Sequence, residues 1–465
     1  MKYYILSFAL LVGMNAFAKH SEVGSPSSGG DGGGHLTLEQ CLERAKQNNH
    51  ELRQAALEIE AATEQKCEAF TNYFPRISAN VMAFRCFDEM VKTSGTYPKE
   101  IAAISPQFAP LIGMPYSIEE FNRAYAVSGT LVQPLYYGGQ IVYGNKLARV
   151  QEDAMTLKLQ LTEKEVLQKV TECYWQLVQV RAGLSTIEAA EKQLEAVMTQ
   201  VENFIRAGVT TRSSQLKVRL RQQELSSNRL KLENADHVLR LLLAQQIGIE
   251  PAQADKGFDI IIEDKPIEQP IEAAAGPLSL SPDHREELQL ADKAVRAQQL
   301  QVKMERGKHM PTLAVGVAGY HTGLGGFSET AKAYLPSTLS DGLVFGTLSI
   351  PLSDWWGGIH AIKRQKIKLQ QAKNDRENAR QMLQIDIQRA WTNLQEAYKQ
   401  TQIAQASCEE AAENLRSTTD QYRMSTCTLT DLLDAETLNR RAQNDLAGAK
   451  AAYQTALADY RRKAF

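Results

Sequence analysis

Residues 129–139 read GTLVQPLYYGG, and residues 346–358 read GTLSIPLSDWWGG. Both stretches begin Gly-Thr-Leu, contain a Pro-Leu pair and close on Gly-Gly, at offsets of 217 to 219 residues. A second pair of stretches, YFPRIS at 73–78 and HMPTLA at 309–314, lies 236 residues apart. Repeats of roughly 20–50 residues mark solenoids and propellers, and this unit is far longer. The sequence therefore predicts one architecture built from two similar halves.

The shared stretches belong to segments in which large apolar residues alternate with small or polar ones. Alternation of this kind is the pattern of a β-strand with two different faces. We expect four strands, over residues 77–83, 125–135, 313–318 and 343–352. The first two are expected to pair as an antiparallel hairpin. The proline-containing segment 88–122 and the glycine-rich segment 322–342 are interpreted as loops.

Long charged segments between the strands have helical periodicity. Thr37 is a candidate N-cap, and apolar residues then recur at heptad spacing toward a helix end near Asn72. A second helical segment runs from about 140 to 205, and Gly183-Leu184-Ser185 within it is the best candidate for a chain reversal. Breaks are predicted at 208–211 and 424–428. Further helices are expected from about 211 to 247, from 282 to 308, from the glycine pair at 357–358 to about 422, and from 429 to the C-terminus.

The N-terminal residues have the features of a secretory signal. Lys2 precedes an apolar run, and Ala16-Phe17-Ala18 is a small-x-small cleavage site. The expected organisation is a signal peptide at 1–18, a flexible segment at 19–35, a first repeat at 36–250, a linker at 251–282 and a second repeat at 283–465. The linker segment is rich in proline.

Composition and motifs exclude several functions. A net charge of −2 gives no indication of nucleic-acid binding. The six cysteines and eight histidines form no metal-ligand cluster, and no nucleophile, phosphate-loop or zinc-protease motif is present. The cysteines are interpreted as small packing residues. We expect neither enzymatic activity nor a cofactor or metal.

Four strands cannot close a barrel, and open sheet edges are not tolerated in lipid. If these strands cross a membrane, the chain must therefore form an oligomer. Two copies supply eight strands and three copies supply twelve, and this count does not choose between them. The alternative is a water-soluble coiled-coil stalk with incidental hairpins.

The chain resembles the TolC-like outer-membrane efflux proteins over nearly its whole length, from Leu36 to about Lys463. The motifs that carry the resemblance are LTLEQCLERA at 36–45 with Asn48-Asn49, the Phe74-Pro75 and Met310-Pro311 pairs, QPLYYGG at 133–139, IPL at 350–352 with Gly357-Gly358, FIRAG at 204–208 and DLLDAE at 431–436. Their order and spacing together are specific.

The resemblance implies an α+β membrane protein that forms a homotrimer. Its twelve β-strands would close a barrel in the outer membrane of a Gram-negative bacterium, and twelve long helices would form a periplasmic α-barrel. The implied function is a passive exit duct of a tripartite efflux or type I secretion system. Substrate would arrive from an inner-membrane pump of the RND, ABC or MFS type through a periplasmic adaptor protein. A soluble periplasmic adaptor is the alternative, and the repeated hairpin-plus-helix order disfavours it.

The resemblance also suggests site residues. Helix tips near 177–187 and 394–403 are expected to form the closable aperture, with Arg181, Glu396, Tyr398 and Lys399 as gating candidates. A solvated helix face is the competing interpretation. Ala182, Gly183, Leu184 and Ser185 are the adaptor-contact candidates, or simply a turn. Phe74, Tyr136, Tyr137, Trp355 and Trp356 fit an aromatic belt at the membrane interface, or they pack against helices.

Overall fold

The structure is a computed structural model that describes residues 35–85, 87, 93–96, 115–118, 120–250, 259–261, 267–268, 282–328, 333–353 and 355–464. The predicted signal peptide, nearly all of the predicted flexible segment and most of the predicted linker lie outside the described residues. The chain divides into two compact units, and each unit draws segments from both halves of the sequence. Unit 1 comprises residues up to 49, 169–266 and 406–451, and unit 2 comprises 50–168, 267–405 and 452–465.

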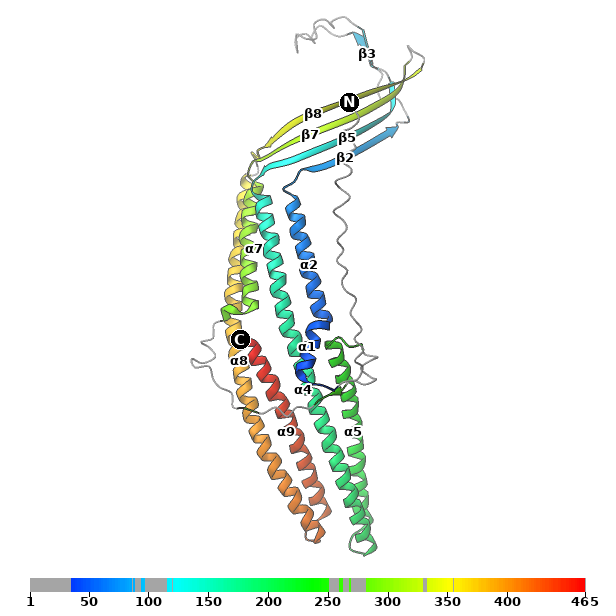
Figure 1. The fold of residues 1–465 in the computed structure, drawn as a ribbon, viewed down its shortest axis with the longest axis vertical. Coiled ribbons are helices and arrows are strands. Elements are labelled where there is room, and N and C mark those ends of the chain that lie inside the picture. Colours follow the sequence, from blue (N-terminus) through cyan, green and yellow to red (C-terminus); the bar gives the residue numbers. More distant parts are fainter. Residues whose placement is uncertain are drawn as a thin grey trace. The chain divides into compact units, whose positions relative to one another are not determined.

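Unit 2 contains a four-stranded antiparallel sheet. Its strands are β2 (Arg76–Arg85), β5 (Glu120–Tyr137), β7 (Thr312–Ser328) and β8 (Ala333–Ser349), and they lie side by side in the order β2-β5-β7-β8 (Figure 1). The predicted hairpin of the first two strands is confirmed. Pro134 lies in an inner strand, where proline is normally excluded, but the pairing of β5 with β7 slips next to it and leaves Leu135 unpaired. A bulge of this kind accommodates the missing N–H.

Both predicted loops are wrong in part. Strands β7 and β8 continue through most of the glycine-rich segment, so that Thr322 pairs with Leu339 and Ser328 with Ala333. In the proline-containing segment, β3 (Thr93–Thr96) pairs antiparallel with β4 (Pro115–Ile118), and β5 begins at Glu120. Glycine weakens a strand in isolation, but a ladder with partners on both sides outweighs that preference. Pro115 occupies the first position of its strand, where proline is tolerated.

Helices complete unit 2. They are α2 (His50–Thr71), the first part of α4 (Gln140–Arg206), the short helix η3 (Pro282–His284), α7 (Glu286–Lys308), most of α8 (Trp355–Arg423) and the end of α9 (Leu429–Ala464). Aromatic side chains form much of one core cluster, in which the rings of Trp391 and Tyr460 are 5.2 Å apart between centroids. Tyr453, also in this cluster, donates its hydroxyl hydrogen to the carbonyl of Glu268 at 2.6 Å.

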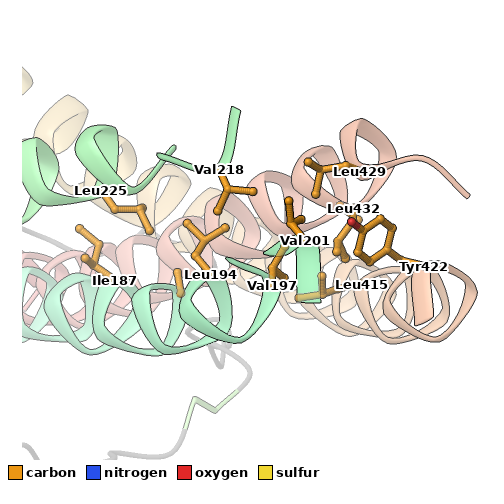
Figure 2. Packing of buried hydrophobic residues seen from close by; sticks show 12 residues of the cluster. Ile187, Leu194, Val197, Val201, Val218, Leu225, Leu415, Tyr422, Leu429 and Leu432 are labelled. Carbon is orange, nitrogen blue, oxygen red and sulfur yellow. The ribbon is translucent and has the colours of Figure 1, made fainter. Parts of the chain in front are cut away.

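Unit 1 is built from helical hairpins. It contains β1 (His35–Leu36), α1 (Leu38–Asn48), the remainder of α4, α5 (Arg212–Gln246), β6 (Asp259–Ile260) and the adjoining parts of α8 and α9. Figure 2 shows the core, where Ile187, Leu194, Val201, Val218 and Leu225 of α4 and α5 meet side chains of α8 and α9. Most of these side chains are almost fully buried, and their burial stabilises the packing of the hairpins.

The first predicted helix is two helices. Thr37 caps α1 as expected, in a capping box with Gln40. Asn49 then takes extended φ and ψ angles of −64° and 134° and ends α1. Its side-chain amide donates to the carbonyl of Gln246, 2.8 Å away at the end of α5. Heptad spacing cannot reveal this break, because the contact that holds it joins residues 197 positions apart.

The reversal expected at Gly183 is wrong. Residue 183 lies inside α4, which continues without interruption for 67 residues. Gly183 is buried, and a Cβ atom there would come within 3.1 Å of Leu232 on α5. The glycine therefore permits close packing of two helices and does not end one. The predicted breaks at 208–211 and 424–428 are both confirmed.

Candidate functional site

The two faces of the four-stranded sheet differ in chemistry. Register partners in adjacent strands share a face, so the ladder assigns each residue to one side. We call one side the apolar face; it comprises Ile77, Ala79, Val81, Ala83, Tyr125, Val127, Gly129, Leu131, Leu313, Val315, Val317, Gly319, Val344, Gly346 and Leu348. Ile77 is 79% exposed and Val344 is 81% exposed. A contiguous apolar surface of this kind indicates contact with lipid or with protein.

The opposite face mixes polar, small and aromatic residues. Ser78 and Thr130 lie there and share a hydrogen bond of 2.6 Å between their hydroxyl oxygens. Asn80, Ser128, Tyr320 and Thr322 belong to the same face. The same face also carries the exposed apolar side chains of Met82 and Leu343, so one face of the sheet is apolar and the other is mixed. Strands with this alternation are typical of a sheet between an apolar medium and an aqueous one.

The two helix reversals have the same backbone hydrogen bonds. At the end of α4, the N–H groups of Gly208 and Val209 donate to the carbonyls of Ile205 and Phe204. At the end of α8, those of Ser425 and Thr426 donate to Tyr422 and Gln421, each 217 residues further on. Gly208 has φ = 71° and Ser425 has φ = 61°, so both take the left-handed position of a Schellman motif. The second reversal has no glycine at this position, and Ser425 adopts the left-handed conformation in its place.

The helices that leave the two reversals are capped differently. At α9, the hydroxyl of Thr428 accepts from the N–H of Asp431, whose carboxylate accepts from the backbone N–H and hydroxyl of Thr428. These hydrogen bonds lower the pKa of the Asp431 carboxyl. At α5, Thr211 makes no side-chain cap, and the position corresponding to Asp431 is Ser214. The second reversal therefore has a negative charge at a helix N-terminus that the first reversal lacks.

Arg181, a predicted gating residue, lies within unit 1 and far along α4 from its end. Its Nε donates to Asp236 of α5 at 3.2 Å, and its guanidinium also contacts the carboxylate of Asp259 and the carbonyl of Ile260 in β6. The strand β6 in turn pairs in parallel with β1. Arg181 therefore anchors part of the inter-repeat segment to α4 and α5, and its partners were not predicted.

A buried ionic cluster joins the two hairpins of unit 1. The carboxylate of Glu436 on α9 is 3% exposed and accepts from Arg221 of α5 at 3.2 and 3.3 Å. Arg440 lies 3.6 Å from the same carboxylate. Burial works against the charge of Arg221, but hydrogen bonds and attraction from Glu224 and Glu436 outweigh it and raise the pKa of the guanidinium. The DLLDAE motif at 431–436 was a sequence signal for this region, although not for the ion pair.

The other predicted aperture and adaptor residues are not at helix ends. Ala182, Gly183, Leu184 and Ser185 lie in the interior of α4. Glu396, Tyr398 and Lys399 lie in the interior of α8, within unit 2, where Tyr398 packs near Tyr453 with ring centroids 6.2 Å apart. Their predicted position at helix tips is therefore wrong, because both helices continue past it. Whether they take part in closing a channel stays a prediction.

The predicted interface aromatics lie where the sheet meets its helices. Phe74 follows α2 and is 54% exposed, with its ring edge-on to Phe70 at 5.5 Å. Tyr136 and Tyr137 end β5 and are about half exposed. Trp356, in the first turn of α8, is 84% exposed. Trp355 begins α8, and its side chain lies outside the described residues.

Two further structural findings concern the described residues only. In this part of the chain, no helix is long and apolar enough to span a membrane. No group of three or more His, Cys, Asp or Glu side chains with the geometry of a metal site occurs among them. The five described cysteines are free thiols; burial raises the pKa of one of them, Cys41, to about 12.

A sheet of four long strands with opposed faces, joined to paired helices of this length, is the architecture of an outer-membrane channel subunit. The chain belongs to the outer membrane efflux protein family, whose model matches residues 41–245 and 278–462. This family consists of channel proteins, and the chain is accordingly an outer-membrane exit duct for efflux. No curated protein matches it by sequence.

Solved structures share this fold. A membrane protein from Pseudomonas aeruginosa is 16% identical, with a TM-score of 0.71 and coverage of 92% of this chain and 93% of that one. The CmeC outer membrane channel of Campylobacter jejuni is 14% identical, with a TM-score of 0.71 and coverage of 92% and 85%. The outer membrane protein VceC of Vibrio cholerae is 15% identical, with a TM-score of 0.69 and coverage of 92% and 96%. At these identities the likeness shows the fold.

Proposed function

We propose that this chain is an internally duplicated subunit of a homotrimeric duct whose twelve strands close a β-barrel and whose helices form a periplasmic α-barrel. The observation that carries the proposal is the four-stranded sheet. Among the described residues, β2 and β8 each pair on one side only, so the sheet has two open edges and one apolar face. Open edges are costly in lipid, and joining edge to edge with further copies removes them.

The duct is passive in this proposal. Substrate reaches it from an inner-membrane pump through a periplasmic adaptor, because the chain has neither a nucleotide-binding motif nor a helix, in its described part, that spans a membrane. The family consists of outer-membrane efflux proteins, which supports this arrangement. The alternatives of a soluble adaptor or a stalk are not supported by the family membership.

The reversals at 208–211 and 424–428 are the proposed periplasmic ends and adaptor contacts. They are the points at which α4 and α8, helices of 67 and 69 residues that begin at the sheet, turn back along the chain. The second reversal carries the Asp431 carboxylate, and the first has Ser214 at the corresponding position. An adaptor that contacts both reversals would distinguish them by this charge. We further propose that four aromatic residues lie where the barrel meets water on the periplasmic side of the outer membrane: Phe74, Tyr136, Tyr137 and Trp356.

Trimer formation and conductance test the proposal together. The full chain, extracted from outer membranes, should crosslink as a trimer and should form ion-conducting pores in planar bilayers. A matched soluble fraction from the same cells serves as the control. Recovery of the mature chain only as a soluble periplasmic monomer, without pore activity, would contradict the proposed function.

A further inference from the structure

The apolar face changes character toward the end of the sheet that lies away from the helices. The stretch of β2 from Ile77 to Arg85 contains nine residues. The stretch of β7 from Leu313 to His321 also contains nine residues. A strand of about 9–11 residues crosses the apolar core of a bilayer. If the proposed function holds, Arg85 and His321 therefore lie at the outer boundary of that core. All residues of this region belong to unit 2.

His321 is the centre of a hydrogen-bonded group that links three strands. Its Nε2 lies 3.0 Å from the hydroxyl of Tyr125 on β5, and its Nδ1 lies 2.6 Å from the hydroxyl of Ser340 on β8. When both ring nitrogens carry hydrogen, they donate to the two hydroxyl oxygens, and each hydroxyl hydrogen is left to bond another acceptor. The imidazole of His321 and the hydroxyl groups of Tyr125 and Ser340 therefore bring several hydrogen-bonding groups together on this face.

The glycine beneath Tyr125 explains why this arrangement forms. Gly323 is the register partner of Tyr125, and a Cβ atom there would come within 2.2 Å of the tyrosine ring. The ring therefore lies directly over the glycine. It also lies 5.6 Å from the imidazole of His321 between ring centroids. The glycine-rich sequence of β7, first interpreted as a loop, makes room for the aromatic ring.

Positive charge continues at the same end of the sheet. Arg85 is exposed and ends β2. Asp341, the register partner of Tyr320, lies on the opposite face. The arrangement therefore suits an anion that approaches from the side of the apolar face.

We propose that this end of the apolar face, with Arg85, His321, Tyr125 and Ser340, binds the phosphate groups of anionic lipid in the outer leaflet. The inference rests on the proposed membrane function and adds a specific lipid site to it. A dissolved anion would bind the charged and polar groups alone and would make no use of the apolar face. A phosphorylated lipid also places its acyl chains along Val81, Val127 and Val317, which continue the same face.

Lipid retention tests the site. The full-length chain is reconstituted in phosphatidylcholine vesicles that contain either phosphatidic acid or diacylglycerol of the same acyl length. It is then extracted in mild detergent, and bound lipid is measured by native mass spectrometry. Wild type should retain phosphatidic acid, and R85Q/H321Q should retain about tenfold less, the ratio that one charge-assisted hydrogen bond supplies. R76Q, which removes a charge from the opposite end and face of β2, is the matched control and should behave as wild type.

The outcomes separate this site from the proposed function. Equal retention by wild type and R85Q/H321Q overturns the lipid site, and so does complete displacement of phosphatidic acid by millimolar inorganic phosphate. Pores formed by wild type in pure phosphatidylcholine bilayers support the duct independently of any lipid preference. Pore formation by R85Q/H321Q shows that the variant folds, and a single variant, R85Q, provides a second measurement if the double variant does not.

Discussion

Two residues at matching positions of the two helix reversals show how one backbone conformation tolerates different side chains. Gly208 and Ser425 both have positive φ and both close a helix with the same pair of hydrogen bonds. Glycine adopts this conformation without steric cost, whereas other L-residues incur roughly 1–2 kcal/mol of strain. The second reversal is therefore strained at its turn, and its cap at Thr428 and Asp431 offsets part of that strain.

Exchanging these turn residues should change stability in opposite directions. Ser425→Gly should raise the free energy of unfolding by about 1 kcal/mol because it removes the left-handed strain, and Gly208→Ser should lower it by a similar amount. Denaturant midpoints measured on the same detergent-solubilised preparation compare the two directly. A loss of stability in Ser425→Gly would contradict the role assigned to φ at this position.

The cap at Asp431 should be sensitive to acid. Hydrogen bonds from Thr428 lower the folded-state pKa of this carboxyl below its ordinary value of 3.8. A lowered folded-state pKa stabilises the folded cap at pH values above the ordinary value, and this stabilisation is lost as pH falls through the folded-state pKa. Near neutral pH, the first turn of α9 should therefore be better protected from hydrogen exchange in wild type than in Asp431→Asn.

As pH falls below the ordinary pKa of Asp431, that difference in protection should shrink toward zero. Exchange rates are corrected for their intrinsic pH dependence. Thr211→Ala, at the uncapped start of α5, serves as the control and should produce no pH-dependent change. Identical protection of wild type and Asp431→Asn at neutral pH would mean that the carboxylate makes no contribution to the cap.

At the scale of elements, an apolar core and a buried ionic cluster around Glu436 hold the helical hairpins of unit 1 together. The core side chains in Figure 2 come from four helices, so each helix covers part of the apolar surface of the others. Glu436 is the charged group buried deepest in this unit's hydrophobic surroundings, at 3% exposure. A buried carboxylate is tolerated only with its partners in place.

Removing one member of the Arg221–Glu436 pair should cost more than removing both members of that pair. Glu436→Ala leaves Arg221 without its buried partner and should destabilise the folded chain by about 3–5 kcal/mol. The double variant Arg221→Met with Glu436→Met should recover much of that loss, because neither charge remains to be desolvated. Chemical unfolding followed by circular dichroism measures both. A double variant no more stable than Glu436→Ala would argue against a desolvation cost.

Close packing between α4 and α5 depends on Gly183. Gly183→Val should destabilise by about 1–3 kcal/mol, because its side chain meets Leu232 where even a Cβ atom is at 3.1 Å. Gly144→Ala is the matched control in the same helix. Its added methyl group has only Met304 nearby, at 3.9 Å, so it should be neutral or stabilise by up to about 1 kcal/mol. Thermal unfolding midpoints of the two variants distinguish packing from helix propensity.

At the scale of the whole molecule, the proposed barrel places one face of the sheet against lipid and the other toward its aqueous interior. Val127 lies on the apolar face and its neighbour Ser128 on the other, so one residue along the chain separates the two environments. A charge on a lipid-facing strand costs about 2–4 kcal/mol near the bilayer midplane, whereas a charge facing an aqueous interior costs little.

Arginine substitutions at these two neighbours should separate the faces. Val127→Arg should reduce the amount of trimer recovered from the outer membrane and lower its resistance to denaturation, whereas Ser128→Arg should assemble normally and change single-channel conductance. Immunoblots of membrane fractions and planar-bilayer recordings measure the two effects. The reverse result, with Ser128→Arg failing to assemble, would mean that the faces are assigned the wrong way round.

Local patterns predicted the strands and helices well. Alternation at Ile77–Ala83 and around Gly129 located strands, and the helix breaks at Gly208 and Met424 were found from the sequence. These features depend on neighbours in the chain, and periodicity records them. The predictions failed at glycines. Gly183 and Gly323 were interpreted as turn and loop residues, yet each makes room for a side chain from a distant segment, Leu232 in one case and Tyr125 in the other.

The sequence by itself determined the repeated order of helix, hairpin, long helix and break, the two-faced strands and the resemblance to outer-membrane efflux proteins. Only the tertiary structure decided that α4 continues past Gly183, which partners Arg181 has, and that His321 lies among Tyr125, Ser340 and the end of the apolar face. The reason is physical: periodicity arises from local backbone geometry, whereas these contacts join residues between 19 and 196 positions apart. Their distances depend on packing and strand register.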